Sequence, residues 1–219
     1  YLGAGAFFGN VRLEEEGVIG TSRRGESREN GRHVRLIEDA LLVTPDYSVK
    51  ADTIYQDRET GDGEAFGNVH IMEPEAKNLV TGDHAVFSES GETAEVDLNP
   101  VMTSREQKGG ALVSVAGLMR FYRTEDRVVM VDSVRIHQDQ ILARADTAVA
   151  HGREHMVLTG APEVSMAESS WMRGDRIDIF YVDGQLREVL VVGNGRMEDS
   201  APDSLARIYE GLPEFDILE

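Results

Sequence analysis

A short pattern recurs about every 30 residues along this chain, and the repeat restricts the possible folds more than any other feature. Its clearest marker is a small residue followed by Asp within an apolar stretch. The marker aspartates fall 31, 63 and 29 residues apart, at Asp52, Asp83, Asp146 and Asp175. The 63-residue gap holds two periods, and Gly117 stands where the missing copy belongs. Internal repeats of this length are typical of stacked supersecondary units.

A second element precedes each marker and begins with a short apolar alternation after Gly, Asn or Asp. Its first valine recurs at a similar spacing, at Val69, Val101, Val134 and Val164. Partial copies are present near Val11, near Val34 and over 193–197. Alternation with period two is typical of a strand that has one buried face and one wet face. The repeat therefore predicts a pair of short strands in each unit.

Polar segments separate these elements, and their Asp-Gly and Ser-Gly pairs favour tight hairpins. The expected fold class is all-β, an elongated antiparallel β-jellyroll of stacked β-hairpin repeats that is open at its ends. We expect one domain over 1–200, with a loop insertion over 20–31 that is rich in Arg, Glu, Ser and Gly. A short C-terminal tail over 201–219 has the pattern of a capped helical turn.

Stacking is required because two short strands cannot bury their apolar face alone. If two layers of hairpins face each other, inward side chains fill the space between them. Layers that splay apart along one seam leave an apolar trough, and acyl chains fit such a space. The sequence thus predicts an elongated molecule with a groove.

Charge and composition exclude several classes of protein. The chain has 219 residues, 40 acidic and 22 basic, with a formal net charge of −18, which repels nucleic acid. It has no Cys, so it forms neither disulfides nor thiolate metal sites. No apolar stretch approaches the roughly 18 residues of a membrane helix. The chain begins at Tyr1, and we expect that a signal peptide or anchor has been removed.

One segment, 151–155, matches the H-x-x-E-H pattern of zinc peptidases. That pattern needs a helix to bring both histidines to one metal ion. Here we expect a turn between a strand ending at Ala150 and a strand beginning at Met156, with Gly152 inside the turn. A zinc site is therefore not predicted.

Other chemical patterns are also weak. The segment 3–9 is glycine-rich, but no strand precedes it, so a strand edge is favoured over a phosphate-binding loop. The recurring aspartates are interpreted as turn residues that accept backbone N–H groups, because an active site needs one unlike pair. The only tryptophan, Trp171, is interpreted as a packing residue. We expect no catalytic residue, no metal site, no cofactor and no enzymatic activity.

The paired pattern, Gly-Asn-Val followed by Ala/Gly-Asp-x-Ala/Ile, resembles that of the OstA-like lipopolysaccharide-transport family, whose members include LptA, LptC and the N-terminal domain of LptD. The resemblance extends from about Val34 to Val192. It implies a periplasmic β-jellyroll that holds lipopolysaccharide acyl chains in a V-shaped interior. It also implies partners: other OstA-like domains bound by edge-strand pairing, and further copies of the chain in a head-to-tail homo-oligomer.

The expected function is a lipopolysaccharide-binding transport or bridge protein between the inner and outer membranes. Lipid-lining candidates are assigned from strand phase, and each also fits plain core packing. They are Val69, Ile71, Phe87, Val101, Val134, Ile136, Val164, Met166, Ile177 and Ile179. The alternative is a structural β-repeat scaffold or surface adhesin without a lipid ligand. A hydrolase on a β scaffold is a third possibility, but it needs a carboxylate or histidine cluster that the sequence does not show.

Overall fold

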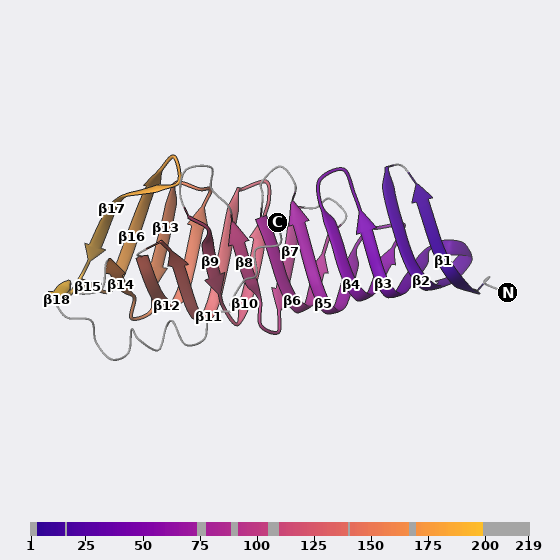
Figure 1. The fold of residues 1–219 in the computed structure, drawn as a ribbon, viewed down its shortest axis with the longest axis horizontal. Coiled ribbons are helices and arrows are strands. Elements are labelled where there is room, and N and C mark those ends of the chain that lie inside the picture. Colours follow the sequence, from indigo (N-terminus) through magenta and orange to yellow (C-terminus); the bar gives the residue numbers. More distant parts are fainter. Residues whose placement is uncertain are drawn as a thin grey trace.

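The computed structural model describes residues 4–15, 17–73, 78–88, 92–104, 110–139, 141–166 and 170–198. Most of them lie in antiparallel strands, with one 3₁₀ turn at Glu29–Gly31. The strands are β1 Gly5–Glu15, β2 Val18–Arg28, β3 His33–Val43, β4 Ser48–Asp57, β5 Gly63–Glu73, β6 Asn78–Phe87, β7 Thr93–Asp97, β8 Val101–Ser104, β9 Leu112–Val115, β10 Leu118–Tyr122, β11 Arg127–Gln138, β12 Ile141–His151, β13 His155–Thr159, β14 Glu163–Met166, β15 Ser170–Arg173, β16 Arg176–Val182, β17 Gln185–Val192 and β18 Arg196–Glu198. The protein is an elongated all-β antiparallel jellyroll, as the repeat predicted (Figure 1).

Each long strand bends near its middle. In the β4–β5 pair the register runs from Ser48 to Lys50, shifts, and resumes at Thr53. The same shift occurs in β1–β2, β2–β3, β3–β4, β5–β6 and β11–β12. Elsewhere two short strands replace the bent one, as β7 and β8 do. The bends align along the molecule and divide the sheet into two leaves.

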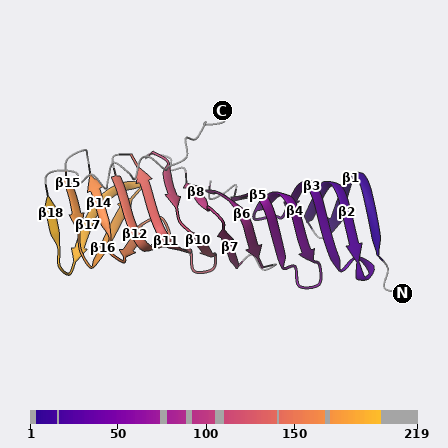
Figure 2. The ribbon, with the colours of Figure 1, turned by 90° about the horizontal axis from the view of Figure 1, so that it is seen from below.

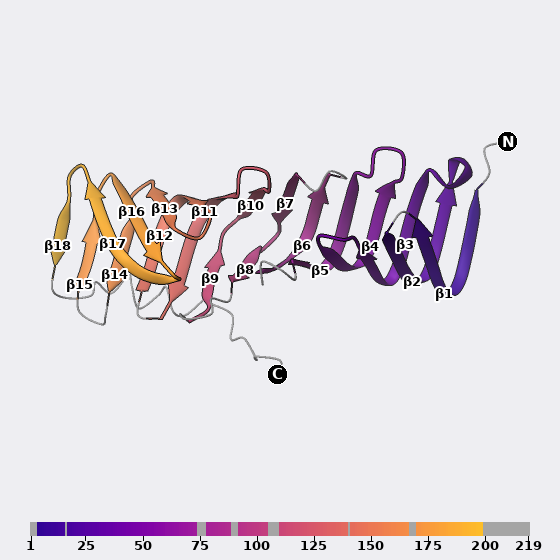
Figure 3. The same ribbon diagram turned by 90° about the horizontal axis from the view of Figure 1, so that it is seen from above.

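Leaf A contains one half of each bent strand, and its pairing order is β1, β2, β3, β4, β5, β6, β7, β10, β11, β12, β13, β16, β17. Leaf B contains the other half, in the order β1 to β6, β8, β9, β11, β12, β14, β15, β18. The leaves share a corner along the line of bends. Figures 2 and 3 show the two layers and the strands at their ends: β1 at one end, β17 and β18 at the other.

The marker aspartates lie at this corner. Gly67 and Asn68 of β5 have positive φ values of 72° and 49°, which bends the strand there. Asp52 of β4 packs over Gly67, where a Cβ would collide with its carboxylate, and Asn68 Nδ2 donates to Asp52 Oδ2 at 3.0 Å. The predicted turn role with backbone N–H donors is therefore wrong in detail. A small residue followed by Asp, or Gly followed by Asn, gives the same sequence pattern at a turn between two strands and at a bend within one strand. The sequence alone therefore does not distinguish the two.

This carboxylate-over-glycine contact repeats along the corner. Asp175 occupies the space beside Gly193 and accepts from Asn194 Nδ2 at 3.0 Å. At the eroded copy the pair is exchanged: Gly117, just before β10, takes the place of the aspartate, and Asp132 of β11, at φ 67°, takes the place of the glycine. The contact is kept although its two residues have changed places.

Two of the predicted hairpin turns are confirmed. Asp183 and Gly184 connect β16 to β17 with φ values of 52° and 75°, which is the two-residue type I′ geometry. A longer turn joins Asp57 of β4 to Gly63 of β5. The predicted turn over 88–92 lies partly outside the described residues, as does the whole tail over 201–219.

The expected loop insertion over 20–31 is wrong, because most of this segment is strand β2. Its inward positions carry Gly20, Ser22 and Gly25 in place of large apolar residues. A Cβ on Gly25 would lie 3.1 Å from Val11 Cγ1, so neighbouring side chains already fill that space. The apolar alternation that identifies a strand is missing from β2, because side chains of neighbouring strands fill the space that large inward side chains of β2 would occupy.

The core lies between the leaves, where inward side chains of both meet. Its largest fully buried side chains come from strands along the whole molecule: Leu42, Ile54, Met119, Met130, Ile136, Leu158, Ile177 and Ile179. Burying an aliphatic side chain of this size contributes about 1.5–3 kcal/mol. Among the described residues, the interior is thus tightly packed by these side chains.

Candidate functional site: an apolar trough between the leaves

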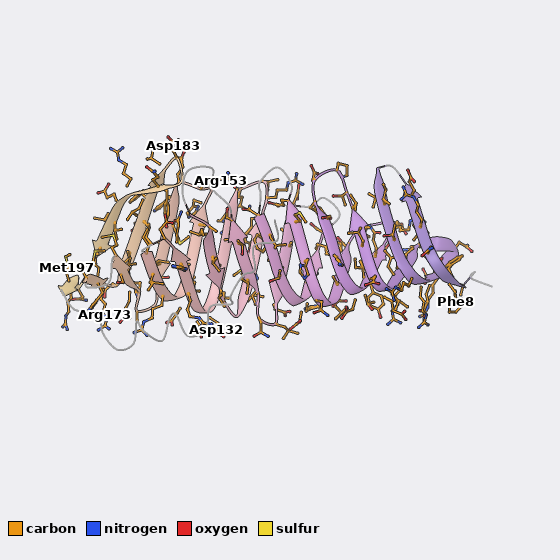
Figure 4. The ribbon with its side chains drawn as sticks, viewed as in Figure 1. Phe8, Asp132, Arg153, Arg173, Asp183 and Met197 are labelled. Atoms are coloured by element: carbon orange, nitrogen blue, oxygen red, sulfur yellow. The ribbon has the colours of Figure 1, made fainter. Side chains whose placement is uncertain are left out.

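The free edges of the two leaves face each other across a seam opposite the corner. The leaf A edge consists of the hairpins β2–β3, β4–β5, β6–β7, β10–β11, β12–β13 and β16–β17, and the leaf B edge of the remaining hairpins. In Figure 4, Arg153 and Asp183 at the leaf A edge lie on the opposite side of the ribbon from Asp132 at the corner. Since only the corner is covalently continuous between the leaves, the seam is where the interior meets solvent.

Three hollows open along the seam. A central hollow of about 310 Å³ and a C-terminal hollow of about 320 Å³ share Glu73, Asn78, Asp126 and Val128 in their walls. They therefore lie next to each other along the seam, and together we call them the trough. A third hollow of about 180 Å³ lies among β1 to β4, against Leu36.

The central hollow has an apolar floor and a polar rim. Its apolar wall residues are Val49, Ile71, Val80, Phe87, Phe121 and Val128. The rings of Tyr47 and Phe87 meet edge to face at 6.3 Å between their centroids. Apolar walls beneath a polar rim suit an aliphatic chain.

Two polar contacts connect the leaves across the seam, in addition to the ring contact of Tyr47 with Phe87. Arg123 of leaf A, just beyond β10, pairs with Asp46 of leaf B, between β3 and β4, at 2.8 Å. The hydrogen bond from Arg123 lowers the pKa of the Asp46 carboxyl below its ordinary value. Farther along, Gln138 Nε2 at the end of β11 donates to the carbonyl oxygen of Gly184 at 3.1 Å. An exposed ion pair and a single neutral hydrogen bond each contribute little, so these contacts join the leaves less firmly than the continuous backbone does at the corner.

The C-terminal hollow is also walled by apolar side chains, but it contains buried polar groups. Met102, Val128 and Met156 form part of its wall, and Gln138 and Tyr181 lie beside them. Burial raises the pKa of Tyr181 to about 12, so its phenol stays protonated at physiological pH. The hollow thus offers neutral hydrogen-bonding groups to an occupant.

The residues assigned by strand phase divide into three groups. Ile71 and Phe87 line the central hollow. Met166 is partly buried and packs against the core. Seven of the ten, Phe87 included, are almost fully buried between the leaves: Val69, Phe87, Val134, Ile136, Val164, Ile177 and Ile179. Their inward orientation is established, whereas their contact with lipid stays a prediction.

Val101 is the exception, because it lies on the outer face of leaf B. It pairs with Thr81 and Val115, while its neighbour Met102 is buried between the leaves. The cause is a bend formed by Leu98 and Asn99, both at positive φ, after which Pro100 takes the inward place that Val69 has in β5. Counting from the valine instead of from the bend shifted the phase by one residue.

Most of the trough residues were missed by the sequence reasoning. They include Tyr47, Val80, Phe121, Val128, Met156 and Tyr181. Strand phase identified the inward face but could not say which inward positions lie near the seam. Distance from the bend, counted along each strand toward its hairpin, is the signal that separates trough positions from core positions.

The zinc-peptidase pattern lies in a hairpin, as predicted. His151 ends β12 and His155 begins β13, with Gly152 at φ 58° between them. Their rings stack at 5.7 Å, and His155 Nε2 lies 2.8 Å from Asp178 Oδ1. Within the described ranges no three His, Cys, Asp or Glu side chains are placed to hold a metal ion.

Fold and site together define an elongated β-jellyroll with an apolar trough along an open seam. No family model matches the chain, and no curated protein matches it. Among solved structures, it is similar to LptH from Pseudomonas aeruginosa, described as the LptA-homologous periplasmic component of the lipopolysaccharide transport device. The identity is 17%, the TM-score is 0.48, and the match covers 52% of this chain and 82% of that one. Among the residues placed in the structure, no helix has the length and apolar character needed to cross a membrane.

Proposed function

We propose that this protein is a non-enzymatic carrier that shelters lipopolysaccharide acyl chains in the trough, in the periplasm between the inner and outer membranes. The observation on which this depends is the adjacency of the central and C-terminal hollows along the seam, where both are lined by Val128, Glu73, Asn78 and Asp126. A passage with apolar walls and a seam along one side lets a chain lie inside while a polar headgroup stays in water. The OstA-like pattern of the repeat supports the choice of lipid.

The ends of the molecule support a role in a longer bridge. β1 is an edge strand of 11 residues, and its Phe8 side chain is 73% exposed. At the other end β17 and β18 are the edges of leaf A and leaf B, and Met197 is exposed (Figure 4). Free strand edges pair readily with further strands. We propose that OstA-like domains, or further copies of this chain, extend the sheet head to tail.

A photo-crosslinking amino acid at position 128, in cells that produce lipopolysaccharide, tests the carrier function. Val128 lies in the wall shared by both hollows, whereas its neighbour Val129 points to the outer face of leaf A, so position 129 is the matched control. Crosslinks to lipopolysaccharide are expected from position 128 and not from 129. Equal labelling from both positions, or none from 128, contradicts the proposal.

A scaffold or adhesin without a lipid ligand is the alternative, and it is favoured by the tight packing of most inward side chains. The two functions are distinguished by the amount of lipid bound to the wild type and to Phe121→Ala, measured by mass spectrometry of organic extracts from the purified proteins. In a carrier the wild type contains lipid and Phe121→Ala alters its amount, because Phe121 lines the central hollow. In a scaffold neither the wild type nor Phe121→Ala contains lipid.

Head-to-tail pairing is tested by the dependence of oligomer size on concentration, measured by analytical ultracentrifugation. Arg12→Pro disrupts the free edge of β1, because Arg12 pairs with Thr21 at a position whose N–H faces away from β2 and a proline there cannot donate to an incoming strand. Phe8→Ala keeps every backbone donor and removes only an exposed ring, so it is the control. We expect Arg12→Pro to abolish the larger species, whereas identical size distributions for all three proteins contradict edge pairing.

A further inference from the structure

Two polar side chains in the wall of the C-terminal hollow are buried without a complete set of hydrogen bonds. Tyr181 is 7% exposed and Gln138 is 3% exposed. The Tyr181 hydroxyl and Gln138 Oε1 have no hydrogen-bond partner among the described residues. Buried polar groups in folded proteins are nearly always paired, so two unpaired groups in one hollow require an explanation.

The free atom of Gln138 is fixed by its other hydrogen bond. Gly184 presents a carbonyl oxygen, which only accepts, so the atom of the side-chain amide that faces it is Nε2. The atom left over is therefore Oε1, an acceptor. Because the same contact connects β11 to the β16–β17 hairpin across the seam, the amide is held in this orientation by both leaves.

The free group of Tyr181 is a neutral phenol that can both donate and accept. With its pKa raised to about 12 by burial, the hydroxyl keeps its proton across the physiological range. The hollow therefore holds one buried acceptor and one buried donor between apolar side chains such as Met102 and Met156. In the central hollow, by contrast, the charged rim residues Asp46 and Arg123 are paired with each other.

We propose that the C-terminal hollow is a subsite for an acyl chain that bears a hydroxyl group. One hydroxyl satisfies both protein groups, because its hydrogen is donated to Gln138 Oε1 and its oxygen accepts from Tyr181. The rest of the chain lies against the methionine and valine wall. This inference deepens the proposed carrier function and rests on it, since it assigns a chemical preference to one part of the trough.

The test compares hydroxylated and plain fatty acids of equal length on the full chain. Myristic acid against 3-hydroxymyristic acid, and stearic acid against 12-hydroxystearic acid, displace a fluorescent fatty acid from the protein. For the wild type we expect the hydroxylated member of at least one pair to bind roughly three- to tenfold more tightly, the effect of about one neutral hydrogen bond. Two pairs are used because the structure does not fix where on the chain the hydroxyl lies.

Two variants locate the preference. Tyr181→Phe removes only the unpaired hydroxyl, so it is expected to fold with unchanged or higher thermal stability and to lose most of the preference for the hydroxylated member of a pair. Tyr47→Phe makes the same chemical change in the central hollow and is expected to keep the wild-type preference. Loss of the preference in both variants, or its survival in Tyr181→Phe, overturns the subsite.

The outcomes separate this inference from the function on which it rests. If plain and hydroxylated chains bind the wild type with equal affinity, the subsite is wrong, water satisfies the two groups, and the carrier function stands. If neither chain displaces the fluorescent probe, acyl binding itself is wrong and the subsite falls with it. A preference that disappears only in Tyr181→Phe supports both.

Discussion

The corner and the seam are the two long edges of the same molecule, and they are built in opposite ways. At the corner a backbone bend, a carboxylate and a glycine lock together in successive units, as Asp52 does with Gly67. At the seam the leaves meet through Arg123 with Asp46 and through Gln138 with Gly184. The fold therefore concentrates rigidity on one edge and leaves the other weakly held. Under the proposed function, we expect lipid to enter by opening the seam while the fold is held at the corner.

The largest effect is expected at the corner. Gly160 has φ 77°, and a Cβ there would lie 2.5 Å from Asp146 Oδ2, so Gly160→Val adds both strain and a collision. We expect this change to lower the free energy of unfolding by about 3–4 kcal/mol, measured by urea denaturation. Gly9→Val is the control, because Gly9 has φ 75° with nothing within 4 Å of its Cβ position, and about half the effect is expected.

The exchanged pair at Gly117 and Asp132 suggests a sharper version of this test. If the corner needs one glycine and one aspartate in either order, the double variant Asp146→Gly with Gly160→Asp should keep most of the stability. Asp tolerates positive φ better than a β-branched residue does, which makes the exchange feasible. A double variant as unstable as Gly160→Val would show that the order of the pair matters.

A smaller effect, on loading and not on folding, is expected at the seam. The chain has no cysteine, so Asp46→Cys with Arg123→Cys allows the leaves to be joined by a cleavable bismaleimide. Joining is expected to reduce lipid uptake about tenfold with little change in thermal stability, and cleavage is expected to restore uptake. Unchanged uptake in the joined protein would mean that lipid enters through the ends.

The smallest expected effect is on the pH dependence of stability, through His84, which follows Asp83 at the corner. Partial burial alone lowers the pKa of His84, but its hydrogen bonds to Glu64 at 2.9 Å and Asp97 at 2.7 Å raise the pKa above the ordinary value. The protonated ring joins β5, β6 and β7, so its contribution is complete below about pH 6.5 and is lost as the pH rises through the raised pKa.

The test follows thermal stability from pH 5 to pH 9. His84→Gln is expected to remove a small decline toward high pH that the wild type shows. His70→Gln on the exposed face of leaf B serves as the control and is expected to retain it. A wild type whose stability increases over the same range would contradict the assigned direction.

Much of the fold was accessible from the sequence because the corner has a chemical signature. The small-Asp and Gly-Asn pairs predicted the period and the strands, and an all-β jellyroll followed. The signature did not show that the bend lies within a strand, because the sequence does not reveal the positive φ of Asn68. For the same reason Val101 was assigned to the wrong face. Strand β2 was predicted as a loop because glycines occupy its inward positions.

The trough was less accessible for a different physical reason. An alternation with period two shows which face of its sheet a side chain lies on. The C-terminal hollow, however, is lined by Gln138, at the leaf B end of β11, and by Tyr181, on β16 of leaf A. Their proximity is set by the angle between the leaves, and no pattern within either strand encodes that angle. Burial of the Tyr181 hydroxyl follows from the same geometry.

The exchange of Gly117 with Asp132 has a consequence for length. If each unit needs only a matched pair at its corner, units can be added or removed without redrawing the cross-section. The thirteen described strands of leaf A, at the usual spacing between paired strands, extend over roughly 60 Å. The number of repeats then sets the length of the molecule, and under the proposed function it sets the distance that one copy can bridge.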